Sequence, residues 1–275
     1  MRHALPRLAL LAGTAALSLA AHAHRPWLLP SATVADGNAP TVSVDAAISE
    51  DLFEFDSFPL ALDTLRVTAP DGSAVAPDAR IEARRRVTFD LKLAQKGTYR
   101  IAGVTDTAMA SWKVGTETRR WRGAPAALAK EVPADAPDLQ VTRQLARAET
   151  FVTNETPSPL AASLTNDGLE LQPLTNPTDL SVGDASRFRV LLDGKPYAGA
   201  DVTLIRGGNR YRYRMGELAL KTDAAGEFSV AWPEAGRWWL GINHGGRGPG
   251  AAAPAPGGAP VRRESYSATF EVLPK

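Results

Sequence analysis

The stretch VTFDLKLAQKGTYRI, residues 87–101, decides the fold class of this chain. Apolar and polar side chains alternate from Val87 to Leu93, which is the period of a strand with one buried face. The alternation resumes from Thr98 to Ile101, and the Gln95-Lys96-Gly97 segment between the two runs is typical of a tight, hairpin-like connection. This stretch therefore predicts two short strands joined by a turn.

Runs of the same period recur along most of the chain. They occupy residues 41–46, 65–68, 111–114, 169–171, 186–192, 200–206, 218–222, 227–232, 237–242 and 266–273. Turns rich in Gly, Asp and Pro separate them, at spacings typical of antiparallel sandwiches. Residues 125–132 fit a short helix, because Pro125 is tolerated in a first turn and Pro133 stops it. Residues 138–148 fit a helix or a strand equally well.

These patterns predict an all-β protein with two antiparallel, Ig-like β-sandwich domains. The prolines of the Thr156-Pro157-Ser158-Pro159 segment mark the neighbourhood of a boundary, because the strand pattern starts afresh beyond them. We therefore expect an N-terminal sandwich over residues 24–160 and a C-terminal sandwich over residues 161–275. The Gly-, Ala- and Pro-rich segment 245–260 interrupts the strand pattern and is expected to be a surface loop.

Composition narrows the possible functions. The chain has 275 residues, 44% of them hydrophobic, which is typical of a globular protein. The 31 Lys and Arg residues nearly balance the 30 Asp and Glu residues, so a nucleic acid partner is not expected. The chain has no cysteine, which excludes disulfides, thiolate nucleophiles and cysteine-bound metals. The remaining chemistry belongs to His, carboxylate, Met, hydroxyl and backbone groups.

Residues 1–23 have the pattern of a secretory signal peptide. Arg2 and Arg7 give a basic start, residues 8–20 are apolar, and Ala21-His22-Ala23 is a small-residue cleavage pattern. The apolar run is too short to span a bilayer, so we expect no membrane insertion of the mature chain. The sequence predicts export to the periplasm, with cleavage after Ala23 making His24 the first residue.

An N-terminal histidine offers two nitrogen donors to a transition metal, its α-amine and its Nδ1 atom. His244 is the other histidine of the expected mature chain and can supply a third nitrogen. The acidic cluster Glu50, Asp51, Glu54 and Asp56 can add a carboxylate, for which Asp51 is the preferred candidate. The predicted metal ligands are therefore His24, His244 and Asp51. The alternative is that His24 merely follows the cleavage site, that His244 is a loop residue and that the acidic cluster is structural.

Motifs for catalysis are missing from the sequence. It contains no Gly-x-Ser-x-Gly elbow, no phosphate-binding Gly-x-x-x-x-Gly-Lys loop and no His-Glu-x-x-His zinc helix. The sequence therefore favours a protein that is not an enzyme. A copper-dependent oxidase that uses the His24 chelate stays open as an alternative, since it would need only an open coordination position.

Six motifs together resemble a periplasmic family of unknown function that is similar to the NikM-like component of nickel and cobalt uptake. They are Trp27–Ser31, Asp51–Asp56, Ala69–Ser73, Glu149–Thr153, Asp193–Pro196 and Tyr266–Val272. The C-terminal half also resembles transthyretin-like and carboxypeptidase-regulatory-like sandwiches. The resemblance implies an exported, β-rich protein that handles nickel, cobalt or another transition metal, with the N-terminal His24 as a ligand.

Three functions follow from these observations. The first is a periplasmic protein that binds nickel, cobalt or copper and supports metal uptake or handling, with a metal-uptake system or an outer-membrane receptor as its partner. The second is a non-catalytic envelope adaptor that binds another protein through its sandwiches and holds no metal. The third is the copper-dependent oxidase. Extension of the mature N-terminus by one residue should cause a large loss of metal binding under the first function and change nothing under the second. Oxygen or hydrogen peroxide consumption by the copper-loaded protein with a reductant tests the third.

Overall fold

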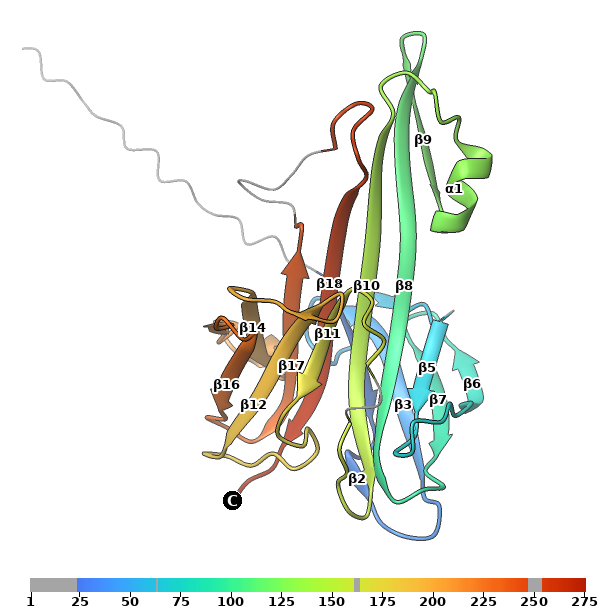
Figure 1. Cartoon of the computed structure of the whole chain (residues 1–275). Helices are drawn as coiled ribbons and strands as arrows, with labels where there is room; N and C mark the ends of the chain where they lie inside the picture. Colours follow the sequence, from blue (N-terminus) through green and yellow to red (C-terminus); the bar gives the residue numbers. More distant parts are fainter. Residues whose placement is uncertain (1–23, 63, 161–163, 247–253) are drawn as a thin grey trace, which may run out of the picture.

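The computed structural model describes residues 24–62, 64–160, 164–246 and 254–275 (Figure 1). The expected signal peptide, residues 1–23, lies outside the described residues, as does part of the expected loop, residues 247–253.

Three β-sheets form the protein. Sheet A has the order β1 (Arg25–Pro30), β3 (Thr41–Ser49), β7 (Val87–Lys92) and β6 (Asp78–Glu82), with β4 (Phe58–Pro59) beside β3. Sheet B has the order β15 (Leu218–Lys221), β14 (Asp201–Arg206), β17 (Gly236–His244), β18 (Val261–Val272), β10 (Gln140–Asn154), β8 (Gly97–Val114) and β5 (Thr64–Thr68), with β2 (Val34–Ala35) on β10 and β9 (Glu117–Gly123) on β8. Sheet C has the order β11 (Leu169–Pro173), β12 (Ala185–Leu192) and β13 (Lys195–Pro196), with β16 (Glu227–Ala231) on β12.

The prediction of an all-β fold is confirmed. The helical elements of the described residues are α1 (Pro125–Glu131), which begins and ends close to the prolines that predicted it, and a short 3₁₀ turn η2 (Asn209–Tyr211). Residues 138–148 belong largely to strand β10, so the helical alternative for them was wrong. Strand pairs are antiparallel, except that β10 runs parallel to β18 and to β2.

Sheet B is the central layer, and each of its faces is covered in part. The side chains of Ala148 and Val152 belong to the core shared with sheet A. The side chain of Phe151, on the same strand β10, belongs to the core shared with sheet C. Successive residues of a strand point to opposite faces, so one strand supplies both cores. We call the two sides of sheet B the A face and the C face.

The hairpin-like connection at Gln95-Lys96-Gly97 joins two sheets instead. Strand β7 pairs with β3 and β6 in sheet A, whereas β8 pairs with β10, β5 and β9 in sheet B. Gly97 has a φ of +123°, and a Cβ atom there would lie 2.8 Å from Pro70 and 2.6 Å from Ser158. The chain therefore turns tightly from one layer to the next, and the expected hairpin was wrong because the alternation fixes strands and not their neighbours.

Strand β8 is much longer than the sequence predicted. Thr98–Ile101 and Ser111–Val114 are the two ends of one 18-residue strand, which extends about 60 Å at roughly 3.4 Å per residue. With β9, β10 and β18 it projects beyond both cores as an arm, and α1 packs beside it (Figure 1).

A buried ionic cluster on the C face links four strands. The carboxylate of Glu149 on β10, which is 1% exposed, accepts hydrogen bonds from Nε of Arg100 on β8 at 3.0 Å and from the Tyr266 hydroxyl on β18 at 2.7 Å. Arg147 lies 3.4 Å from Glu149 and 3.5 Å from Glu170 on β11. The cluster therefore joins both halves of the chain.

Burial acts on the titration of this cluster. Burial is the largest single influence on the pKa of Arg100 and would lower it, but Glu149, Tyr266 and Glu170 together outweigh burial and raise that pKa. Burial raises the pKa of Tyr266 well above its usual value, and Glu149 adds to the effect. Both groups therefore hold their protons through the physiological range.

We predict that Glu149→Gln destabilises the protein by about 3–5 kcal/mol, because it leaves the buried guanidinium group of Arg100 without its counter-ion and leaves Arg147 with Glu170 as its remaining carboxylate partner. The free energy of unfolding in urea measures the effect. The matched control is Asp106→Asn on the neighbouring strand β8, which removes the partly exposed pair of Asp106 and Arg143 and should cost no more than about 1 kcal/mol. An equal loss in both variants would contradict a special role for the cluster.

Candidate functional site

His24 lies at the edge of sheet A, directly before β1. Arg25 pairs with Ser49 of β3, so the register brings His24 opposite Glu50, the residue that follows β3. Nε2 of His24 is 3.8 Å from Oε1 of Glu50, and the imidazole ring lies 5.7 Å from the Phe58 ring. The side chains of His24 and Glu50 are 46% and 49% exposed, so this pair is open to solvent.

The turn after β3 is held by one carboxylate. Asp56 accepts hydrogen bonds from the backbone N–H groups of Glu50 at 3.1 Å and Asp51 at 2.9 Å, and from the Ser57 hydroxyl at 2.7 Å. Burial opposes ionisation of Asp56, but these hydrogen bonds outweigh it and hold the pKa of the carboxyl below its usual value. Asp56 therefore fixes the backbone of Glu50 beside His24.

Asp51 has a different partner. Its Oδ1 accepts a hydrogen bond from Nδ2 of Asn209 at 3.1 Å, and the Asn209 Oδ1 accepts one from the backbone N–H of Leu52 at 3.0 Å. Asn209 belongs to the η2 turn that follows β14. Asp51 thus ties the edge of sheet A to the far end of sheet B, and the carboxylate that the structure brings to the His24 imidazole is that of Glu50.

His244 ends strand β17 and points to the C face. The preceding alternate residues, Leu240 and Ile242, belong to the core shared with sheet C. The Nδ1 atom of His244 is 2.9 Å from the Tyr197 hydroxyl, and the two rings meet edge to face at 5.3 Å. A tyrosine hydroxyl therefore satisfies this imidazole nitrogen.

His24 and His244 lie on opposite faces of sheet B. His24 lines a cavity of about 270 Å³ together with Trp239, Asn243 and Ser265 on the A face. Asn243 and His244 are successive residues of β17, so their side chains diverge. The structure does not bring the two predicted histidine ligands together. Within the described parts of the chain, no group of three or more His, Cys, Asp or Glu residues is placed to hold a metal ion.

The sequence analysis did not predict that Glu50 lies beside His24. Glu50 belongs to the acidic cluster named above, but its place beside His24 depends on the pairing of β1 with β3. Strand β1 contains Pro26 and Pro30, and because proline is uncommon within strands, the sequence pattern did not predict this strand.

We predict that Asp56→Ala lowers stability at neutral pH by about 1–2 kcal/mol, since two backbone N–H groups and a hydroxyl lose their acceptor. The pKa of Asp56 is depressed in the folded protein, so its contribution is present above the unfolded value of 3.8 and is lost as pH falls through the lower folded value. Thermal unfolding of parent and variant should therefore differ most at pH 7, and the difference should be smaller at pH 3.

The control is Glu54→Gln in the same turn. Its carboxylate has no hydrogen bond to the described residues, so this variant should unfold like the parent at both pH values. A gap between parent and Asp56→Ala that persists unchanged at pH 3 would show that the carboxylate charge is not the cause.

Among the described residues, no helix is both long and apolar enough to cross a membrane.

Comparison with solved structures finds weak likenesses. The D0–D1 domains of intimin are 13% identical, with 89% of this chain and 97% of that chain covered and a TM-score of 0.23. A DUF4785 family protein from Legionella pneumophila is 8% identical, with 86% and 54% covered and a TM-score of 0.25. Trypsin-activated alpha-2-macroglobulin from Escherichia coli is 15% identical, with 90% and 16% covered and a TM-score of 0.26. The chain thus spans about half of the Legionella protein and a small part of the macroglobulin.

Curated proteins provide no sequence match to this chain. One family model does match, over residues 21–246, and its description is a domain of unknown function, DUF4198. That match covers most of the sequence, and the chain belongs to the DUF4198 family.

Proposed function

We propose that this protein is exported to the periplasm and binds nickel, cobalt or copper at His24, in support of metal uptake or handling. The observation that carries the proposal is the approach of the Glu50 carboxylate to Nε2 of His24, at 3.8 Å, at the open edge of sheet A. The resemblance to NikM-like proteins also supports this proposal. We further propose that the C-terminal half is transthyretin-like.

The surroundings of His24 suit a metal chelate in which this one residue supplies both nitrogen donors. Cleavage after Ala23 would free the α-amine of His24, which can then bind a metal together with Nδ1 of the same residue. The other ring nitrogen, Nε2, faces Glu50. A metal-bound histidine commonly directs its second ring N–H to a carboxylate, which fixes the ring and makes the bound nitrogen more basic. We therefore assign Glu50 a positioning role and His24 the ligand role.

The exposure of the pair favours a carrier over a structural metal site. His24 and Glu50 are each about half exposed, and the adjoining cavity opens toward solvent. A metal held by two nitrogens of one residue would keep further coordination positions for water or for donors of a partner. Such a site suits capture and transfer of an ion, and the proposed partner is a metal-uptake system or an outer-membrane receptor.

We predict that protein beginning at His24 binds Ni²⁺ and Cu²⁺ in calorimetric titrations, and that intact mass of the exported chain shows this start. A form that keeps Ala23 ahead of His24 should lose most of the affinity, because the α-nitrogen is then an amide. His24→Ala should do the same, and Glu50→Gln should weaken binding by about tenfold or more.

His244→Ala is the matched control, since His244 lies on the other face of sheet B and contacts Tyr197. It should bind both ions like the parent. Equal affinity with and without Ala23 would contradict the proposal and favour the envelope adaptor instead.

A further inference from the structure

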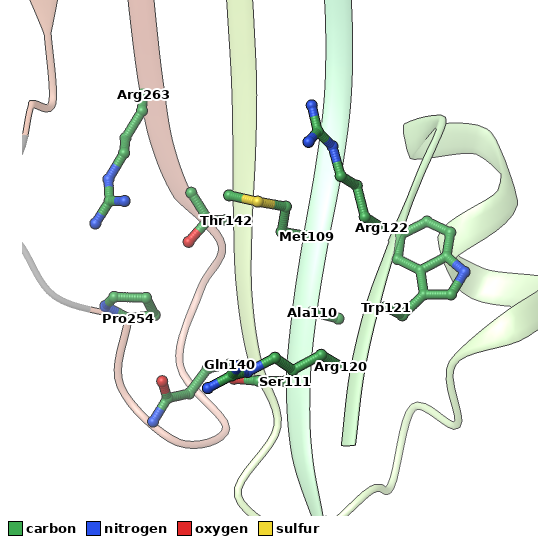
Figure 2. Close-up of a pocket in the computed structure, with 10 residues that line it drawn as sticks. All are labelled: Met109, Ala110, Ser111, Arg120, Trp121, Arg122, Gln140, Thr142, Pro254 and Arg263. Atoms are coloured by element: carbon green, nitrogen blue, oxygen red, sulfur yellow. The ribbon is translucent and has the colours of Figure 1, made fainter. Parts of the chain in front are cut away.

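The projecting arm carries a second cavity, of about 480 Å³, on the same A face as His24 (Figure 2). Met109 of β8 and Thr142 of β10 form its floor. Arg120 and Arg122 of β9 flank it on one side, and Arg263 of β18 flanks it on the other. Strands that lie apart in the sequence therefore bring three guanidinium groups around one hollow.

Strand alternation separates the charges of the arm between its two faces. Arg122 pairs in register with Met109, and Arg120 with Ser111, which places both arginines on the A face. Arg263 pairs with Gln144 of β10 on that face. The carboxylates of the arm strands belong to residues of the opposite parity, Asp106, Glu117 and Glu264, and so point to the C face.

The arginines of the cavity differ from those on the C face in their partners. On the C face, Arg143 pairs with Asp106 at 2.7 Å, and Arg262 pairs with Asp193 at 2.6 Å. Arg120, Arg122 and Arg263 form no ion pair with any carboxylate of the described residues. The Nε atom of Arg263 is buried and, within the described chain, lacks a hydrogen-bond acceptor. The three guanidinium groups that surround the cavity therefore have no carboxylate partner in the described chain and can pair with the oxyanions of a ligand.

We propose that this cavity binds a small organic polycarboxylate. Guanidinium groups match carboxylate oxygens in two parallel hydrogen bonds, and three of them around one hollow suit a ligand with more than one carboxylate. The volume lies within the range of small-molecule sites. The Met109 thioether on the floor offers contact to a carbon skeleton, which a bare inorganic anion lacks, while the Thr142 hydroxyl and the Gln140 amide offer further hydrogen bonds.

The shape of the site favours a small molecule over a macromolecular surface. Strand β9 bounds the hollow on one side, and Pro254 with β18 bounds it on the other. The segment that follows Pro254 is fixed to the arm, because the N–H of Gly257 donates to the carbonyl of Leu139 at 2.8 Å. The site is independent of the metal chemistry proposed for His24.

Calorimetric titration of citrate into metal-free full-length protein at low salt tests the proposal. We expect saturable binding of roughly one citrate per chain that weakens as salt is raised. Arg120→Gln and Arg263→Gln should each weaken it by about tenfold or more. The matched control is Arg119→Gln, which removes the same charge from the next residue of β9 but on the opposite face, and should bind within about twofold of the parent.

Two further measurements distinguish polycarboxylate binding from metal chelation and from general attraction of anions. His24→Ala should bind citrate like the parent, so failure of the metal proposal leaves this one standing. Pyrophosphate, titrated in the same way, should bind more weakly than citrate because it has no carbon skeleton to meet Met109. The proposal is overturned if citrate does not bind, if Arg119→Gln weakens binding as much as Arg120→Gln, or if pyrophosphate is preferred.

Discussion

The carboxylate of Glu149 is the group on which the architecture depends. It lies within the central sheet at 1% exposure, where an isolated charge would be very costly. Arg100, Arg147 and Tyr266 surround it, and they come from β8, β10 and β18. Arg100 also donates to the carbonyl of Leu171 on β11, so the same cluster reaches sheet C. The three long strands that meet at the middle of the protein thus all contribute to the surroundings of this one group.

Strand β10, which carries Glu149, also connects the two hydrophobic cores. Its A face contributes to one core through Val152, and its C face contributes to the other through Phe151. Sandwiched strands of this kind do not show simple alternation, because both faces are buried. The N-terminal part of the same strand lies in the arm, where Gln140 and Thr142 on its A face line the arginine-lined cavity. The His24 edge and the arginine-lined cavity thus share one continuous sheet surface.

Alternation in the sequence predicted most strands but could not predict their neighbours. Val87–Leu93 and Thr98–Ile101 are strands as expected, yet they belong to different sheets, because pairing depends on contacts far away in the chain. The same limit applies to the candidate site. His24 was a candidate because of its own chemistry. Whether Glu50 or Asp51 lies beside it depends on the register between β1 and β3, and a shift of one residue would exchange the two. The arginines of β9 could be sorted by face only once the strand and its pairing with β8 were known.

The parallel pairing of β10 with β18 has a consequence for how the chain reaches this structure. Thr150 of β10 pairs with Thr269 of β18, 119 residues later in the chain. During synthesis, this edge of β10 therefore stays unpaired until most of the second half of the chain has been translated. Contacts of such long range slow folding, and an unpaired strand edge invites pairing with other chains in the meantime. A chaperone that shields this edge until β18 arrives would therefore raise the yield of native protein more than one that acts on either core alone.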